Sequence, residues 1–323
     1  MTYKYDEQDF RAILASGQLN NDAADSESAF FAKELEHVKA RTYDEKLPNL
    51  SAMRLFPIST EADPGADSIA YDSYSGTGVA KLISNYADDL PRADVKGERV
   101  VVQVHQGGTA YGFNTQEIRA AKMKGLNLSA RKAISARRAS DTLINKLAFK
   151  GDKEKGIVGV LDNPNISSVV PKGDGASSST KWEDKTAVQV LRDMNEAVTA
   201  IVDITNGVEI PDTIVLPLKQ YAYITNTIVP DTGGESIATN FKKNNPYIKN
   251  IEQAVEMKGA GTGNTDVMLV YRKDVNAVSL EIPLPFTQLA PQFHNLEYTI
   301  PCEFRTAGVI VYYPLSMATM AGI

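Results

Sequence analysis

The chain has 323 residues, of which 43% are hydrophobic and 23% are charged, and its 34 Lys and Arg against 40 Asp and Glu give a net charge of −6. This composition is that of a globular protein of about two domains, and it argues against a disordered chain or a wholly basic nucleic-acid-binding protein. The chain has one cysteine and three histidines. A single cysteine excludes an intrachain disulfide and a thiolate zinc cage, and low cysteine use favours a reducing compartment such as the cytoplasm. The sequence also has no signal peptide and no apolar run of about 18 residues.

The first 50 residues have the composition of an arm rather than of a compact domain. A helix is predicted over 26–46, with Phe31, Leu35 and Val38 on one face. An isolated helix of this length is marginal in water, so we expect it to dock on another surface.

Residues 60–105 predict a long β-hairpin. Ile69, Tyr71 and Tyr74 lie before a polar stretch, and Val100 and Val102 alternate with other residues after it, with the turn expected around 88–94. A ribbon of two strands is marginally stable alone, because it has too little core of its own. The hairpin is therefore predicted to need a partner surface.

Two helices are predicted next. Asn114 and Glu117 form a capping box for a short helix that ends near Gly125. Ser129 is the predicted cap of a longer helix that runs to Lys150 and is closed by Gly151. The predicted packing face of this longer helix comprises Ala133, Ala136, Ser140, Leu143 and Leu147.

Charge is segregated between these regions. Residues 115–150 hold nine basic and two acidic side chains, a net of +7, whereas residues 1–72 hold 14 acidic and seven basic ones. One interpretation is a solvated helix face. The other is that Arg131, Lys132, Arg137 and Arg138 meet acidic arms of neighbouring chains or a polyanion.

The second half predicts further α and β elements. A surface loop is expected over 165–185, a helix of about 20 residues from Ala187, a strand over 214–216 ended by a proline, and a helix over 236–245. Residues 267–271 and 278–282 are expected to form a hairpin across 272–276. The alternation from Leu296 to Arg305 predicts a half-buried strand that is at an edge or bulged at Pro301, and an apolar strand follows over 309–313. The predicted fold class is α+β.

No catalytic, cofactor-binding or metal-ligating motif emerges. The glycines of 107–112 have Walker-A spacing, but Phe113 and Asn114 stand where Lys and Ser or Thr are needed, and 259–263 reads as a turn. His105 and Cys302 are interpreted as structural. A cytosolic α+β enzyme that binds a phosphate ligand on these glycine-rich loops remains the alternative of a different class.

The ordered set of segments resembles the major capsid proteins of tailed bacteriophages with the Hong Kong 97 fold, in a subgroup long catalogued as a family of unknown function. The strings LISNYADDLPRADV, GIVGVLDNPNI, NNPYIKNIEQAVEMKGAG and EFRTAGVIVYYP carry this resemblance, which covers nearly the whole chain from about Phe30. No single motif is diagnostic; the order of the set is.

The resemblance implies a domain organisation. It comprises an N-terminal arm (1–50), a peripheral domain with the long spine helix (51–59 and 106–183), an extended loop (60–105), an axial domain (184–285), and C-terminal strands that return to the peripheral domain and its junction with the axial one (286–323).

The resemblance also implies a function without enzymatic activity. The expected protein self-assembles into hexamers and pentamers of an icosahedral or prolate shell around double-stranded DNA, in the host bacterial cytoplasm, with possible scaffold, portal and decoration proteins and no membrane or cofactor. Loop contacts between subunits are expected at Lys81, Asp88, Asp89 and Arg92, and covalent cross-linking through Lys81 is not expected. An encapsulin-like nanocompartment shell is the related alternative.

Overall fold

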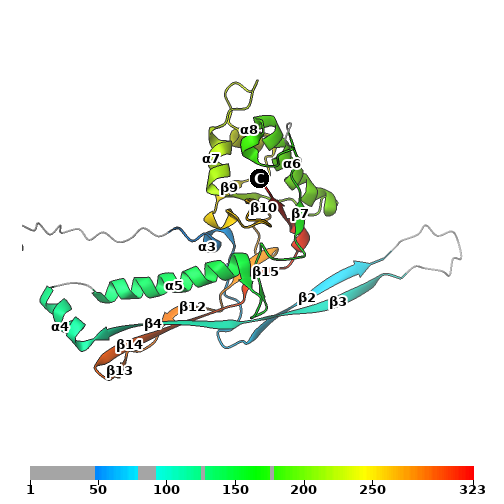
Figure 1. The fold of residues 1–323 in the computed structure, drawn as a ribbon. Helices are drawn as coiled ribbons and strands as arrows, with labels where there is room; N and C mark the ends of the chain where they lie inside the picture. The colour runs from blue at the N-terminus through cyan, green and yellow to red at the C-terminus, as the bar shows by residue number, and fades with distance from the viewer. Residues whose placement is uncertain (1–47, 79–91, 125–127, 175–177) are drawn as a thin grey trace, which may run out of the picture. The chain divides into compact units, whose positions relative to one another are not determined.

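The computed structural model describes residues 48–78, 92–124, 128–174 and 178–323. The helix predicted over 26–46 and most of the hairpin turn predicted around 88–94 lie outside these residues. Helices and strands alternate along the described chain, which confirms the predicted α+β class (Figure 1).

The elements follow in chain order. Among the described residues, the helices are α3 (Ala52–Leu55), α4 (Thr115–Lys124), α5 (Leu128–Lys150), α6 (Ala187–Ile204), α7 (Leu218–Asn226) and α8 (Ile237–Asn244), with 3-10 turns η1 (Trp182–Asp184), η2 (Val255–Met257) and η3 (Pro314–Ser316). The strands are β1 (Ile58–Ser59), β2 (Ser68–Thr77), β3 (Asp94–Gln103), β4 (His105–Asn114), β5 (Gly151–Asp152), β6 (Ile157–Val158), β7 (Ser167–Val169), β8 (Thr213–Leu216), β9 (Asn250–Gln253), β10 (Val267–Tyr271), β11 (Val278–Glu281), β12 (Leu284–Gln288), β13 (Gln292–His294), β14 (Glu297–Thr306), β15 (Gly308–Val311) and β16 (Met317–Ala321).

The predicted hairpin is confirmed as β2 paired antiparallel with β3, from Ser68 opposite Gln103 to Thr77 opposite Asp94. Strand β4 follows β3 after a single residue, Val104, which is buried. The partner changes there, because β3 pairs with β2 whereas β4 pairs with β14 over ten residues.

The two helices after the hairpin are also confirmed. Asn114 Oδ1 accepts the Gln116 N–H, and the Glu117 carboxylate accepts the Asn114 N–H, so the predicted capping box opens α4. Helix α5 begins at Leu128 rather than after a cap at Ser129. It ends before Gly151, whose φ of +66° and close approach to the Ile157 carbonyl leave no room for a Cβ atom.

Helix α5 packs along β4 (Figure 1). Its buried residues differ in part from the predicted face. Ala136, Ser140 and Leu147 are buried as expected, but Leu143 is exposed and Ile144 is buried instead. The buried face of the C-terminal half of α5 is therefore wider than the predicted small-residue face, and it includes the large side chain of Ile144.

A five-stranded sheet, in the order β7-β16-β10-β8-β9, lies between two hydrophobic clusters. Leu269 and Tyr271 of β10 belong to the cluster that contains the end of α5, while Met268 and Val270 belong to the cluster that contains α6, α7 and α8. Alternate residues of one strand thus join both cores, as the two-residue period of a strand requires. The bounds expected for the axial domain, 184–285, stay a prediction. The five-stranded sheet includes β7 and β16, which lie outside that range.

One prediction about strands is wrong, and two others hold only in part. Residues 267–271 and 278–282 do not form a hairpin, because β10 pairs with β8 and β16 whereas β11 pairs with β1 and β15. The segment 165–185 is not only a loop, since β7 pairs in parallel with β16. Of the two alternatives predicted for the strand around Pro301, the edge is excluded, because β4 lies on one side of β14 and β12 and β13 on the other; the pairing of β12 with β14 does contain a register shift.

Pro301 is accommodated where the neighbouring strands are interrupted. Its carbonyl accepts the Leu289 N–H at 2.9 Å, and β12 ends at Gln288 while β13 begins at Gln292. The missing N–H of proline therefore faces the gap between two strands and breaks no regular ladder.

A buried ionic network holds the segment before α6 against that helix. The Lys185 ammonium is fully buried and donates to Asp193 at 2.5 Å and to the Lys172 carbonyl at 2.7 Å. Arg192 donates to Asp174 at 2.6 Å and to Asp193 at 2.9 Å. Lys185 also lies 3.3 Å from Asp174, so the Asp193 and Asp174 carboxylates each meet both cations.

Candidate interaction surfaces

The base of the β2–β3 hairpin is fixed to the sheet. Arg305 of β14 donates to the Pro64 carbonyl at 2.6 Å and to Asp67 at 2.9 Å. The ring of Tyr71 meets that of Tyr312 edge-on, with 4.9 Å between centroids. These contacts set the direction in which the hairpin leaves the sheet.

Beyond its base the described part of the hairpin carries an exposed apolar stripe. Tyr74, Val95 and Val101 are 70%, 63% and 51% exposed. The register places all three on one face, because Tyr74 is opposite Gly97, Val95 is opposite Gly76, and residues of one strand alternate between faces. A stripe of this kind on an unsupported ribbon indicates a contact with another molecule.

The predicted loop contacts are only partly within the described residues. Arg92 lies just before β3 and is exposed, while Lys81, Asp88 and Asp89 lie outside the described ranges. Arg92 lies three residues before Val95, and its contact with a neighbouring subunit stays a prediction.

Lys132 joins α5 to the end of β4 within one chain. Its ammonium donates to Glu117 at 2.8 Å and to the Gly112 carbonyl at 2.7 Å, and it lies 4.6 Å from the centre of the Phe113 ring. The hydrogen bond from Lys132 and the Asn114 N–H lower the pKa of Glu117 from its ordinary value of 4.5.

This ion pair gives the stability of the protein an acid-dependent component. Because the pKa of Glu117 is lower in the folded chain, its contribution is complete above the ordinary pKa and is lost as the pH falls through the lowered one. We expect Glu117→Gln to lower the melting temperature at pH 7, and we expect the difference from wild type to shrink towards pH 3. Thermal melts at several pH values measure this, with the exposed Glu154→Gln as the control; a difference that does not change with pH would contradict it.

The other three basic residues lie on the first half of α5. Arg131 is exposed, and the side chain of Arg137 is 71% exposed and lies 3.9 Å from Asp141. Arg138 donates to the Pro48 carbonyl. Burial raises the pKa of Asp141, an effect that Arg137 and Arg138 only partly oppose. Lys132 and Arg138 thus make contacts within the chain, while a contact of this helix face with acidic arms or a polyanion stays a prediction.

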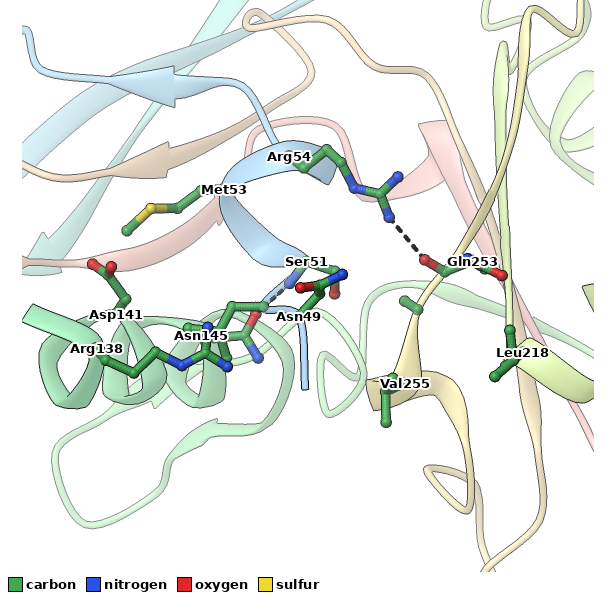
Figure 2. Close-up of a pocket in the computed structure, with 12 residues that line it drawn as sticks. Asn49, Ser51, Met53, Arg54, Arg138, Asp141, Asn145, Leu218, Gln253 and Val255 are labelled. Carbon is green, nitrogen blue, oxygen red and sulfur yellow. Dashed lines mark hydrogen bonds between the residues drawn. The ribbon is translucent and has the colours of Figure 1, made fainter. Parts of the chain in front are cut away.

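A cavity of about 690 Å³ adjoins this part of α5 (Figure 2). Its walls come from the residues before α3, from α5, and from the segment that joins β9 to η2. The lining residues are Asn49, Leu50, Ser51, Met53, Arg54, Arg138, Asp141, Asn145, Leu218, Gln253, Ala254 and Val255. Sequence reasoning did not anticipate this cavity, because its walls are up to about two hundred residues apart along the chain.

Asn145 organises one wall of the cavity. Its Oδ1 accepts the N–H groups of Ser51 at 3.1 Å and Ala52 at 2.9 Å, and its Nδ2 donates to Glu256 at 2.7 Å. These amides open α3, whose first N–H groups have no partner inside the helix. A single side chain thus secures the chain where it enters the described domain.

Asn145→Ala is expected to cost about 2–3 kcal/mol of unfolding free energy, because two backbone amides lose their acceptor in a buried setting. Denaturant titration measures this loss, and hydrogen exchange is expected to quicken at Ser51 and Ala52. The exposed Asn165→Ala is the control, and an Asn145→Ala protein with wild-type exchange at these two amides would contradict the prediction.

The glycine-rich segments do not form phosphate sites. Residues 107–112 lie within β4 and pair with β14. In the second segment, Gly259 donates to Asp266 and Gly261 bridges Thr265, which makes the predicted turn. Cys302 is buried as predicted, and burial raises the pKa of its thiol.

Two further site classes can be assessed within the described part of the chain. No group of three or more His, Cys, Asp or Glu there converges as a metal site would. No helix in the same residues has the length and apolar character needed to cross a membrane.

The comparisons with known proteins agree on one fold. A family model described as major capsid protein matches residues 78–323. Among solved structures, the chain is similar to the capsid of Myoviridae phage XM1, with a TM-score of 0.77, 17% identity, and 90% of this chain and 98% of that one covered. It is also similar to the capsid of a native GTA particle (TM-score 0.63, 12% identity, 94% and 99% covered) and to a chain of Mycobacterium phage Ogopogo (0.61, 13%, 91% and 98%). A search among curated proteins finds no match.

The matched family and the fold shared with the solved capsids point to the same assignment. Because the family model spans well over half of the sequence, the chain belongs to the major capsid protein family, with the Hong Kong 97-type fold predicted from its sequence.

Proposed function

We propose that this chain assembles into hexamers and pentamers of a closed icosahedral or prolate shell that encloses double-stranded DNA, in the cytoplasm of the host bacterium. The observation that carries the proposal is the exposed apolar stripe of the β2–β3 hairpin. Most side chains of β2 and β3 are exposed in the single chain, so the apolar stripe is proposed to be buried against another copy.

Further partners follow from this role. A shell of this kind is proposed to use scaffold, portal and decoration proteins, and to contact packaged DNA without reading its sequence. The role needs no enzymatic activity, since the subunit acts through its surfaces.

Electron microscopy of particles purified from cells that express the full chain tests the proposal. We expect closed shells with five- and six-fold capsomers. In whole virions, we expect the enclosed DNA to be protected from added nuclease. A chain that stays monomeric at high concentration, with or without its neighbouring genes, would refute the proposal. Shells that hold protein cargo and no DNA would favour the encapsulin-like alternative.

A further inference from the structure

A smaller cavity, of about 310 Å³, lies between η1 and α7. Trp182 of η1 and Gln220 of α7 form its floor, and these two residues are 1% and 4% exposed. The half-buried Tyr223 also lines the cavity. An apolar cavity of about 150 Å³ is enough to bind benzene, so this cavity has room for a ligand with a single ring.

Two polar atoms of the floor have no hydrogen-bond partner among the described residues. They are Nε1 of Trp182, which is a donor, and Oε1 of Gln220, which is an acceptor. Both atoms are buried, and buried polar groups without a partner are rare in folded proteins. The two atoms therefore indicate a ligand that brings one acceptor and one donor into the cavity.

The amide of Gln220 is fixed in the orientation that leaves its oxygen unpaired. Its Nε2 donates to Asp266 at 2.7 Å and to the Ile323 backbone oxygen at 3.3 Å. Exchanging the two ends of the amide would set its oxygen against both of these acceptors, so the nitrogen keeps its position. A ligand can therefore only donate to Gln220, just as it can only accept from Trp182.

The charged residues that line the cavity neutralise each other. Lys219 of α7 donates to Glu183 of η1 at 2.5 Å, and both side chains are more than half exposed. The lining residues therefore offer no further cation to an anionic ligand and no further anion to a cationic one. Because an exposed ion pair holds its geometry only weakly, these two side chains can move aside as a ligand enters.

We propose that this cavity binds a small neutral molecule that carries a carboxamide on an apolar ring. The carboxamide oxygen accepts from the Trp182 indole, its N–H donates to the Gln220 oxygen, and the ring packs against Tyr223. A carboxylate would set its oxygens against Gln220, and an ammonium would set its hydrogens against the indole N–H, so each charged analogue leaves one buried group unpaired. This site does not depend on assembly, since all its residues belong to one chain.

Trp182 makes the site directly observable, because it is the only tryptophan of the chain. The unassembled full-length chain is titrated with cyclohexanecarboxamide while its tryptophan fluorescence is recorded. Cyclohexanecarboxylate and cyclohexylmethylamine, which keep the ring and carry a charge, are the matched ligands. We expect saturable binding of the carboxamide and at least about ten-fold weaker binding of both charged ligands, because each leaves a buried group unpaired.

Substitutions in α7 separate recognition from packing. Gln220→Met removes the accepting oxygen and is expected to abolish the preference for the carboxamide over the carboxylate, which a general loss of packing would not do. Ala222→Leu enlarges an exposed residue that lines the cavity, and it is expected to weaken binding of the carboxamide several-fold while the chain stays folded. Thr225→Leu, at another exposed position of α7 outside the cavity, is the control and is expected to leave binding unchanged.

Each contrary outcome has a distinct meaning. A titration without a saturable change in Trp182 fluorescence would overturn the inference, as would equal affinities for the carboxamide and the carboxylate. Equal binding by the wild type and Ala222→Leu would place the ligand elsewhere and would equally overturn it. Binding that is lost when the chain is assembled into particles would show that a neighbouring copy covers the cavity, and would overturn a free molecule as its occupant. Because the titration needs no particles, a failure of shell assembly would refute only the proposed function.

Discussion

Replacing Tyr74 and Val95 with aspartate is expected to abolish shell formation while leaving the isolated subunit folded. Both side chains are more than 60% exposed in the single chain, so each substitution changes its unfolding free energy by no more than about 0.5 kcal/mol. In an assembled shell each new carboxylate would have to be buried without a partner, which costs several kcal/mol at every copy of the contact. Particle yield by sedimentation and the melting temperature of the unassembled chain measure the two effects separately.

The opposite face of the same hairpin supplies the control. Ser73 and Ser75 are exposed and neighbour Tyr74 along β2, but their side chains point to the other face. Ser73→Asp with Ser75→Asp adds the same charge to the same ribbon and is expected to retain most of the particle yield. Normal shells from the Tyr74 and Val95 variant would mean that the stripe is not an assembly contact.

Asp193→Ala is expected to cost about 3 kcal/mol of unfolding free energy, the largest loss of stability from a single substitution considered for this chain. The Lys185 ammonium is fully buried and would lose the carboxylate that it contacts at 2.5 Å. Removing one partner of a buried pair costs about 3–5 kcal/mol, and Asp174, 3.3 Å from Lys185, keeps the value near the lower bound. Denaturant titration of the unassembled chain measures the loss.

A surface pair in the same region provides the comparison. Lys219 and Glu183 form an ion pair in which both side chains are more than half exposed, so Glu183→Ala is expected to cost less than about 1 kcal/mol. Replacing both partners, with Lys185→Met and Asp193→Leu, is expected to recover much of the loss, because the buried ammonium and the buried carboxylate are removed together and Asp174 keeps its contact with Arg192. Equal losses for Asp193→Ala and Glu183→Ala would contradict the buried assignment.

The sequence predicts the elements whose signals are local. The capping box at Asn114 and Glu117 and the glycine after Lys150 bound α4 and α5, and the alternation from Leu296 to Arg305 matches β14. The sequence pattern does not predict α7, because Pro217 marks the end of β8 and serves at the same time as the N-cap of the helix, where its missing N–H costs no intrahelical hydrogen bond.

The pairing of strands is the part that local patterns do not determine. Strands β10 and β11 are buried along their whole length, which shows that each has neighbours on both sides and covered faces. A two-stranded hairpin would leave one face exposed, so the unbroken apolar run of β10 is evidence against it, whereas the sequence of β11 alternates apolar and polar residues and gives no such signal. The parallel pairing of β7 with β16 joins segments about 150 residues apart and has no signal in either.

The candidate surfaces show the same division. The positive charge of α5 and the need of the hairpin for a partner follow from the sequence. The engagement of Lys132 by Glu117, the cavity beside Arg138 and the position of Tyr74, Val95 and Val101 on one face depend on tertiary contacts and register.

The single residue Val104 between β3 and β4 has a mechanical consequence. One uninterrupted backbone passes from the hairpin into the sheet that carries α5, and Arg305 clamps the neighbouring Asp67 to the same sheet. A force applied to β2 and β3 is therefore transmitted through the backbone to β4 and to its ten-residue ladder with β14, because no flexible linker lies between β3 and β4. In a particle, strain at the contact made by the hairpin would in this way reach the sheet of the subunit to which the hairpin belongs.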